Sequence, residues 1–257
     1  MLKLGNTAFI LVLLCSLAAN PSLISITKAQ EDNAAPQRSL KLVTEEYPPL
    51  NMSDDTGKIT GAATELLRIA ANKANIALQI RLLPWKRAYH DALEEKEVCI
   101  YSTWRTSARE DLFIWVGPLA NDGWSFFAPR DKNIQISSLK DTFRYRVGGI
   151  DGWAFTQYLQ QKGHPFLDLT SIEDETNARK LQAGRIDLWA TGRISGRQII
   201  KQKKAHDIEE VYAVREIGLW LACNTDTDPK IIKDLQNALD QFERDGTAKK
   251  IRATFKF

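Results

Sequence analysis

Strand-like segments alternate with segments of helical period along this chain from Leu40 onward. Apolar residues of 60–76 and of 85–93 recur every three or four positions, as they do on one face of a helix. Short β-rich runs, such as residues 40–44 and 98–103, stand between these helical segments. Strands that alternate with helices of about 10–15 residues are typical of α/β proteins with largely parallel sheets. The sequence therefore predicts an α/β fold.

The first residues have the pattern of an export signal. Lys3 precedes an uncharged apolar run, residues 8–19, which ends at an Asn-Pro pair. The run is shorter than the roughly 20 apolar residues of a membrane span, and it fits a secretory signal peptide. We expect cleavage after Ala29, which makes residues 1–29 the signal peptide and the mature protein periplasmic. An uncleaved anchor and a lipoprotein signal at Cys15 are the alternatives.

Charge and motif content exclude several classes of function. Loss of residues 1–29 removes two lysines and no acid, so 35 basic and 32 acidic residues become 33 and 32. A nearly neutral chain lacks the broad basic surface of a nucleic-acid-binding protein. The histidines His90, His164 and His206 stand far from one another and from the cysteines, and no nucleotide-binding or nucleophile motif occurs. The sequence predicts no metal, no cofactor and no nucleic-acid partner.

Two cysteines remain in the predicted mature chain, Cys99 and Cys223, each in an apolar strand-like stretch. Two cysteines that are far apart in sequence do not define a disulfide framework. We therefore expect buried free thiols. An oxidising compartment would permit a bridge, but the sequence does not show whether the two residues meet.

Residues 101–118 contain two arginines one helical turn apart, Arg105 and Arg109. Ser107 and Glu110 have the spacing of a capping box, so a short helix should begin near Ser107, directly after a strand. The free amide groups at a helix start favour an anion. A guanidinium in that first turn can bind a carboxylate through two parallel hydrogen bonds, and Arg109 is placed to do so. The alternative is a surface ion pair between Arg109 and a neighbouring acidic residue.

Several motifs, in order, resemble the periplasmic solute-binding proteins of family 3, the polar amino acid type. TSARE, followed by an apolar stretch and Gly-Pro, is similar to the family's T-P-E-R-E…F-x-P signature. VTEEYPPLNM resembles its first strand and turn, and SSLKDTFRYRVGG resembles the start of its second lobe. LQAGRIDLWAT and the closing DPKIIKDLQNALDQFERDGTAKKI complete the match. The resemblance covers nearly the whole predicted mature chain.

The resemblance implies a two-lobed fold in which two crossing hinge strands join α/β lobes, with the ligand enclosed between the lobes. Lobe 1 would contain residues 38–123 and 224–257, and lobe 2 would contain residues 124–223. The crossings would lie near residues 124–129 and 219–224. Ligand capture would then close the lobes by a hinge motion.

The resemblance also implies which residues bind the ligand. The arginine of the T-x-x-R motif, here Arg109, would hold the ligand carboxylate, and a loop at a helix start in the second lobe would face it. The implied ligand-binding set is Tyr47, Trp85, Ser102, Arg105, Thr106, Arg109, Asp151, Gly152 and Trp153.

Two positions depart from the family pattern. Gly192 stands where the family has the carboxylate that receives an amino group, and Trp153 and Ala154 replace the hydroxyl residues of the second-lobe loop. An ammonium group that is buried without a partner loses its hydration uncompensated. We therefore expect a preference for organic acids without an α-amino group, or for ligands whose cation reaches Asp151.

The predicted function is binding rather than catalysis. A monomeric protein would capture a small carboxylate-bearing ligand, an amino acid or a related organic acid, for an ABC-type permease. A ligand-sensing partner of a membrane receptor is one alternative. A periplasmic dehydratase on the same fold is another, with Glu46 or Asp151 as its acid or base. Arg87 could pair with Asp91 along its helix, and Arg105 could point to solvent.

Overall fold

The structure is a computed structural model that describes residues 38–256. The predicted signal peptide, residues 1–29, lies outside the described residues. Within residues 38–256, no helix is both long enough and apolar enough to cross a membrane.

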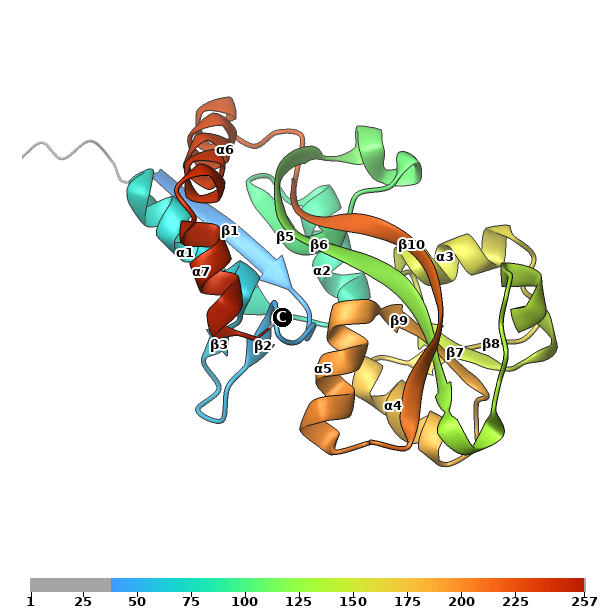
Figure 1. The fold of residues 1–257 in the computed structure, drawn as a ribbon. Helices are drawn as coiled ribbons and strands as arrows, with labels where there is room; N and C mark the ends of the chain where they lie inside the picture. The colour runs from blue at the N-terminus through green and yellow to red at the C-terminus, as the bar shows by residue number, and fades with distance from the viewer. Residues whose placement is uncertain (1–37, 257) are drawn as a thin grey trace, which may run out of the picture. The chain divides into compact units, whose positions relative to one another are not determined.

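An eight-stranded sheet with the strand order β4-β1-β5-β10-β6-β9-β7-β8 runs through the described chain (Figure 1). One end of the sheet is a parallel group made of β4 (Ile76–Leu82), β1 (Arg38–Thr44) and β5 (Val98–Trp104). The other end is a parallel group made of β9 (Leu188–Gly192), β7 (Val147–Ile150) and β8 (Leu167–Ser171). These two groups are the strands of the first and the second lobe, and they confirm the predicted two-lobed α/β fold.

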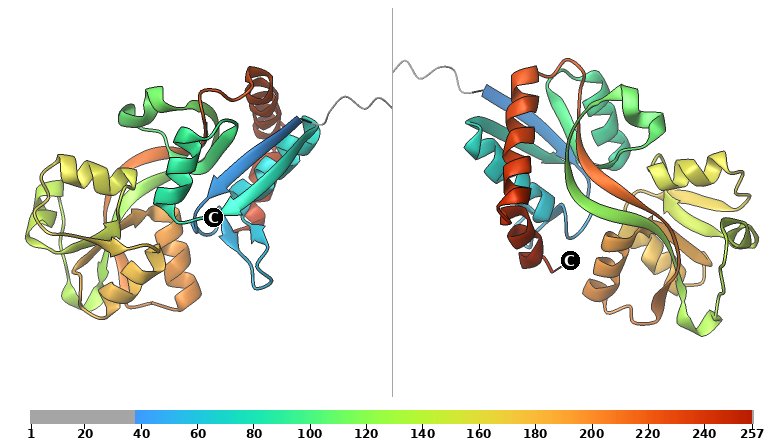
Figure 2. Two further views of the ribbon diagram at one scale, coloured as in Figure 1. Left: turned by 180° about the vertical axis from the view of Figure 1, so that it is seen from behind. Right: turned by 45° about the horizontal axis from the view of Figure 1, so that its top comes forward.

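Two long strands join the lobes, β6 (Ile114–Pro129) and β10 (Ile208–Cys223). They pair antiparallel along almost their whole length and lie side by side in both views of Figure 2. β10 pairs with β5 from Leu219 onward, and β6 pairs with β9 from Trp124 onward. Between these points, residues 121–123 of β6 pair only with residues 216–218 of β10. These two stretches lie directly before the segments 124–129 and 219–224 that the sequence predicts for the crossings. The predicted lobe boundaries stay predictions, since the contacts group the described residues into one unit.

Helices cover each group of strands. In the first lobe, α1 (Ala62–Lys73), α6 (Pro229–Arg244) and α7 (Thr247–Thr254) pack against one another, and α2 (Trp85–Glu94) contacts β1 and β5. In the second lobe, the helices that contact the strands are α3 (Ala154–Gln161), α4 (Asp174–Gln182) and α5 (Arg193–Lys203). A short hairpin of β2 (Met52–Ser53) and β3 (Ile59–Thr60) follows β1. The described residues also form short 3₁₀ helices, namely η1 (Ser107–Leu112), η2 (Arg130–Lys132) and η3 (Leu139–Arg144).

The helical periods at 60–76 and 85–93 correspond to α1 and α2, so both predictions are confirmed. The sequence shows two separate apolar, strand-like runs at 210–214 and 219–223, and in the structure both belong to a single strand, β10. Its register against β6 shifts three times, between Glu210 and Tyr212, between Ala213 and Arg215, and between Leu219 and Leu221. Such bulges interrupt the two-residue alternation, so a bulged strand looks like separate segments in the sequence.

Cys99 and Cys223 form a disulfide, so the expectation of free thiols is wrong. Both residues are fully buried, and they lie opposite each other in the antiparallel register of β5 and β10. The two cysteines are 124 residues apart in sequence. They meet because β10 runs back from the second lobe and pairs with β5. No local sequence pattern predicts this pairing. The bridge fastens the end of β10 to the core of the first lobe.

Candidate functional site

Arg109 is a buried arginine with unused hydrogen-bonding capacity. It lies in η1, and only 2% of its surface is exposed. Its Nη2 donates to the carbonyl oxygen of Gly152 at 2.9 Å and to Oε1 of Gln157 at 3.2 Å. Its Nε and Nη1 are buried and find no hydrogen-bond partner among the described residues. Burial lowers the pKa of Arg109 to about 10, although Tyr89 and Glu45 oppose this shift.

Aromatic rings of α2 hold the Arg109 guanidinium. Its central carbon lies 5.0 Å from the ring centroid of Trp85 and 5.0 Å from that of Tyr89. A cation over aromatic faces gains more when it is desolvated, so these rings partly offset the loss of hydration.

A small pocket lies beside this arginine, between the two lobes. Its lining comes from both lobes and consists of Glu45, Tyr47, Trp85, Ser102, Trp104, Trp153 and Ala154. The free volume between these side chains is about 10 Å³, which is the room of a single water molecule. The Oγ of Ser102 and the Nε1 of Trp104 are buried and lack hydrogen-bond partners among the described residues. Any ligand as large as an amino acid therefore requires lining side chains to move.

Trp153 of the second lobe packs against aromatic rings of the first lobe at this pocket. Its side chain is 2% exposed, and its ring centroid lies 5.7 Å from that of Tyr47 and 5.5 Å from that of Trp104. Its Nε1 donates to Oε2 of Glu45 at 2.9 Å. Burial raises the pKa of Glu45 well above its usual range, while the Trp153 hydrogen bond and the Arg109 charge oppose the rise. A carboxylate and a guanidinium of the first lobe thus both contact the segment Gly152–Trp153 of the second lobe.

Gly192 makes room for a contact at the crossing strands. The hydroxyl of Tyr47 donates to Oδ2 of Asp122 at 2.6 Å. Oδ1 of Asp122 accepts hydrogen bonds from the backbone amides of Gly123 at 2.7 Å and Ile194 at 3.0 Å. A Cβ atom at position 192 would lie 1.5 Å from the Tyr47 hydroxyl oxygen. The absence of a side chain at Gly192 is thus what this tyrosine–aspartate pair requires.

Of the predicted site residues, Arg105 and Thr106 do not line the pocket. Arg105 binds the carboxylate of Glu110 through both Nε and Nη2 and lies 4.7 Å from the ring centroid of Trp220. Glu110 is therefore not available for the predicted capping box, and η1 has no side-chain cap at Thr106. The helix start near Ser107 is confirmed, but as six residues of 3₁₀ helix. The alternative surface ion pair for Arg109 is wrong, because Arg109 turns inward.

Asp151 also lies outside the pocket lining. Its carboxylate pairs with Nζ of Lys86 at 2.5 Å, and its side chain is 40% exposed. The predicted pairing of Arg87 with Asp91 is confirmed at 2.6 Å. The other predicted residues, Tyr47, Trp85, Ser102, Arg109, Gly152 and Trp153, come together around the pocket or contact a residue that lines it.

Sequence reasoning missed Glu45, Asp122 and Gln157. Glu45 follows the carboxyl end of β1, and ligands of open α/β sheets bind at the carboxyl ends of strands, so its position was a usable signal. Asp122 and Gln157 act through contacts with Tyr47 and Arg109, and the 75 and 48 residues that separate these partners leave no local pattern.

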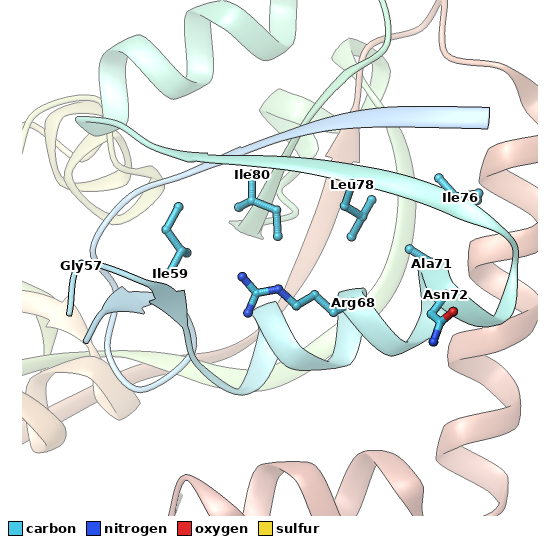
Figure 3. Close-up of a pocket in the computed structure, with 8 residues that line it drawn as sticks. All are labelled: Gly57, Ile59, Arg68, Ala71, Asn72, Ile76, Leu78 and Ile80. Atoms are coloured by element: carbon cyan, nitrogen blue, oxygen red, sulfur yellow. The ribbon is translucent and has the colours of Figure 1, made fainter. Parts of the chain in front are cut away.

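A roomier hollow of about 520 Å³ lies along the edge strand β4 (Figure 3). The aliphatic side chains of Ile76, Leu78 and Ile80 line one side, and the Arg68 side chain lies across it. Nη1 of Arg68 is already paired with Oε1 of Glu65 at 2.5 Å. None of the buried, unpaired polar atoms among the described residues belongs to a residue that lines this hollow. Among the described residues, no three His, Cys, Asp or Glu side chains gather as metal ligands either.

The family model of the bacterial extracellular solute-binding proteins, family 3, matches residues 40–256. The chain belongs to this family. The L-cystine-binding protein TcyJ of Escherichia coli (strain K12) is 23% identical over 252 residues, which cover 95% of this chain and 92% of TcyJ. The family and this relative are solute-binding proteins, so this family 3 protein is a binding protein and not an enzyme.

Solved structures of the same fold support the two-lobed architecture. A histidine kinase sensor domain with similarity to periplasmic binding proteins matches with a TM-score of 0.79 and 20% identity, over 86% of this chain and 97% of that one. An ancestral arginine-binding protein bound to arginine matches with a TM-score of 0.77 and 19% identity, over 85% and 98%. A substrate-binding protein of an ABC uptake transporter from Streptococcus pneumoniae, with bound histidine, has a TM-score of 0.77 and 12% identity, over 85% and 92%.

Proposed function

We propose that this family 3 protein binds a small carboxylate-bearing ligand, an amino acid or a related organic acid, in the pocket beside Arg109. The observation that carries the proposal is the buried guanidinium of Arg109, whose Nε and Nη1 lack partners. A buried charge with unsatisfied donors is costly unless another group completes its hydrogen bonds. A ligand carboxylate would complete them with the two-pronged geometry that guanidinium favours.

The relatives support this ligand class, since their names record binding of cystine, arginine and histidine. The proposed contacts are the residues around the pocket, Tyr47, Trp85, Ser102, Arg109, Gly152 and Trp153. Arg105 and Asp151 are left out of this set because they have ion-pair partners elsewhere, and Thr106 is left out because it does not line the pocket. Arg109 and Gly152 do not line it either, but Arg109 packs on the lining residue Trp85 and donates a hydrogen bond to the carbonyl oxygen of Gly152.

Ligand entry requires the lining of the pocket to open. The lining side chains leave about 10 Å³ between them, so the ligand must displace Trp153 or reach the pocket from an open form. We propose that residues 121–123 and 216–218, which pair only with each other, act as the hinge between the lobes. Hinge closure around a ligand is the motion that a two-lobed binding protein uses.

The ligand would pass from this protein to an ABC-type permease in the membrane. A second candidate is a ligand-sensing role beside a membrane receptor, and it is favoured by the likeness to a histidine kinase sensor domain. Both roles use the same pocket and differ in the partner that recognises the closed lobes. Cross-linking in intact cells supplied with the ligand would capture either a permease subunit or a receptor.

A thermal-shift screen tests the proposed ligand class. The panel contains the standard L-amino acids, L-cystine and the matching 2-hydroxy and 2-keto acids. A ligand at about 100 times its Kd stabilises the folded protein by about 2.7 kcal/mol, which should raise the Tm by roughly 5–10 °C. The absence of any shift with a carboxylate-bearing compound would contradict the proposal. Compounds that have the same side chains but carry an amide instead of the carboxylate are the control.

Export is proposed from the apolar run at residues 8–19 and the family of the chain. The mature protein should begin at or near Gln30 and accumulate in the periplasm. N-terminal sequencing of the protein from periplasmic extract measures this start. Recovery of the protein in the membrane fraction with an intact first segment would instead indicate an anchor.

A further inference from the structure

The eight-stranded sheet has two edge strands, and they differ in how well they are protected against pairing with a further strand. Among the described residues, β8 pairs with β7 alone and β4 pairs with β1 alone. β8 has five residues, and its register against β7 shifts between Gly148 and Ile150. The carboxylate of Asp168 also accepts a hydrogen bond from the backbone amide of Thr170 at 3.1 Å. A short strand, a bulge and a charged side chain protect an edge, so β8 offers little free backbone.

β4 has none of these protections. It contains seven residues, and its register against β1 is unbroken over all seven. Its sequence, IALQIRL, has no proline and a single charged residue, Arg81, which pairs with Asp91 at 3.0 Å. A long and regular edge strand of this kind is a template for another strand.

Alternate residues of β4 direct their backbone groups away from β1. Just after the strand, the amide of Leu83 donates to the carbonyl oxygen of Thr44 at 2.7 Å. Because successive residues of a strand alternate in direction, the odd-numbered residues of β4 bond to β1 and the even-numbered residues face the open edge. The residues that face the open edge are Ile76, Leu78, Ile80 and Leu82. A second strand can form hydrogen bonds with the backbone of each of them.

Three of these residues have side chains that border an open hollow. Ile76, Leu78 and Ile80 line the hollow of about 520 Å³ beside β4 (Figure 3). The β2–β3 hairpin lies at the Ile80 end of this hollow, and the last turn of α1 lies at the Ile76 end. Apolar side chains of a neighbouring strand would fill the hollow and bury this aliphatic row.

β4 is complementary to itself. Two copies that pair antiparallel about Gln79 match all seven residues of the strand. The opposite pairs are Ile76 with Leu82, Ala77 with Arg81, Leu78 with Ile80, and Gln79 with Gln79. No like charges face each other in this register, and the aliphatic residues of both copies lie on one face of the joined sheet. The two-fold axis also brings the hairpin end of one hollow to the α1 end of the other.

We propose that two copies of this chain pair through β4 and form a two-fold dimer in which the two sheets join. The dimer uses a surface apart from the ligand pocket, since no residue of β4 lines that pocket. The free edges of the joined sheet are the two β8 strands, whose protection stops the assembly at two copies. One strand and one hollow from each copy form a small interface, so we expect weak association. The inference replaces the monomer that the sequence predicts.

Sedimentation equilibrium of the mature protein from about 5 to 300 µM tests this association, and the wild type should change from monomer to dimer in that range. Gln79 is exposed, so a charge there should not disturb the fold. Gln79→Lys and Gln79→Glu each place like charges opposite each other across the axis, and each should weaken the dimer at least about 3-fold. An equal mixture of the two variants should recover the wild-type association, because opposite charges then face each other. Gln161→Lys, an exposed change on α3, is the matched control and should leave the association unchanged.

A disulfide between two copies tests the register. Opposite residues of a non-hydrogen-bonded antiparallel pair have Cα atoms about 4.5 Å apart, which is within the reach of a disulfide. Gln79→Cys should therefore form a covalent dimer on mild oxidation, while Cys99 and Cys223 stay in their own bridge. Ala77→Cys lies on the same face of β4, but its two copies would be roughly 13 Å apart along the strands. Ala77→Cys and Gln161→Cys should stay monomeric on a non-reducing gel.

The results that would overturn this inference are specific. A wild-type protein that is monomeric over the whole concentration range excludes the dimer. A dimer that both charge variants of Gln79 leave unchanged, or that their mixture fails to recover, uses another surface. Equal cross-linking of Gln79→Cys and Ala77→Cys excludes the register about Gln79.

Discussion

Replacing Arg109 with alanine should abolish or sharply weaken ligand binding while the protein remains folded. The substitution removes the buried guanidinium, which is 2% exposed and has two free donors. It would leave the ligand carboxylate buried without its partner. Loss of one member of such a pair costs about 2–5 kcal/mol, which is about 30- to 5,000-fold in affinity. Calorimetry with the best ligand of the panel measures the loss, and the thermal unfolding of the free protein reports on the fold.

Two further arginine variants sharpen this result. Arg109→Lys keeps the charge but loses the planar fork, so it should bind more weakly than the wild type and more tightly than Arg109→Ala. Arg105→Ala should have a much smaller effect, because Arg105 is engaged with Glu110 and Trp220 outside the pocket. Equal and small losses for Arg109→Ala and Arg105→Ala would contradict the assignment of Arg109 as the carboxylate-binding residue.

Of the proposed variants, the one that lacks the disulfide should show the largest loss in the free energy of unfolding. The Cys99–Cys223 bridge closes a loop of 124 residues, and the loop-entropy model gives about 4–5 kcal/mol for a loop of this length. Measured losses for native disulfides are about 2–5 kcal/mol. We therefore expect the double variant Cys99→Ala/Cys223→Ala to unfold about 5–15 °C below the wild type. Differential scanning calorimetry under oxidising conditions measures the difference.

The redox state provides the control for the disulfide prediction. Reduced wild-type protein should unfold near the temperature of the double variant, and reductant should leave the double variant unchanged. Thiol titration of the unfolded, unreduced wild type should find no free thiol. Two free thiols, or equal Tm values for the oxidised and reduced protein, would contradict the bridge. Ligand affinity should be retained, since both cysteines lie in the core of the first lobe and not in the pocket.

The parts of the molecule that the sequence predicts well are those that leave a local signature. Helical period marks α1 and α2, and the motif around Arg109 marks the end of β5 and the start of η1. The family resemblance implies a role for Tyr47 after a strand end and for Trp85 at a helix start, and both residues line the pocket. In each of these cases, the residues whose pattern predicts the element lie within about two helical turns of one another.

The missed features depend on contacts between distant segments. Glu45 meets Trp153 across 108 residues, and Tyr47 meets Asp122 across 75. The sequence predicts that Gly192 removes a binding group. In the structure it is the space that the Tyr47–Asp122 contact occupies. A single sequence does not show which distant side chains are in contact. The contacts of Glu45 and Asp122 therefore could not be predicted from it.

The order of the strands also constrains how the disulfide is made. Cys99 lies on β5, whereas Cys223 lies at the end of β10, after the whole second lobe. A chain exported from its N-terminus would present the Cys99 thiol to the oxidising compartment well before its partner arrives. If residues 1–29 are cleaved as predicted, no other cysteine remains in the chain. Oxidation within the chain can then form only the Cys99–Cys223 disulfide. No mispaired disulfide within the chain would require a disulfide isomerase.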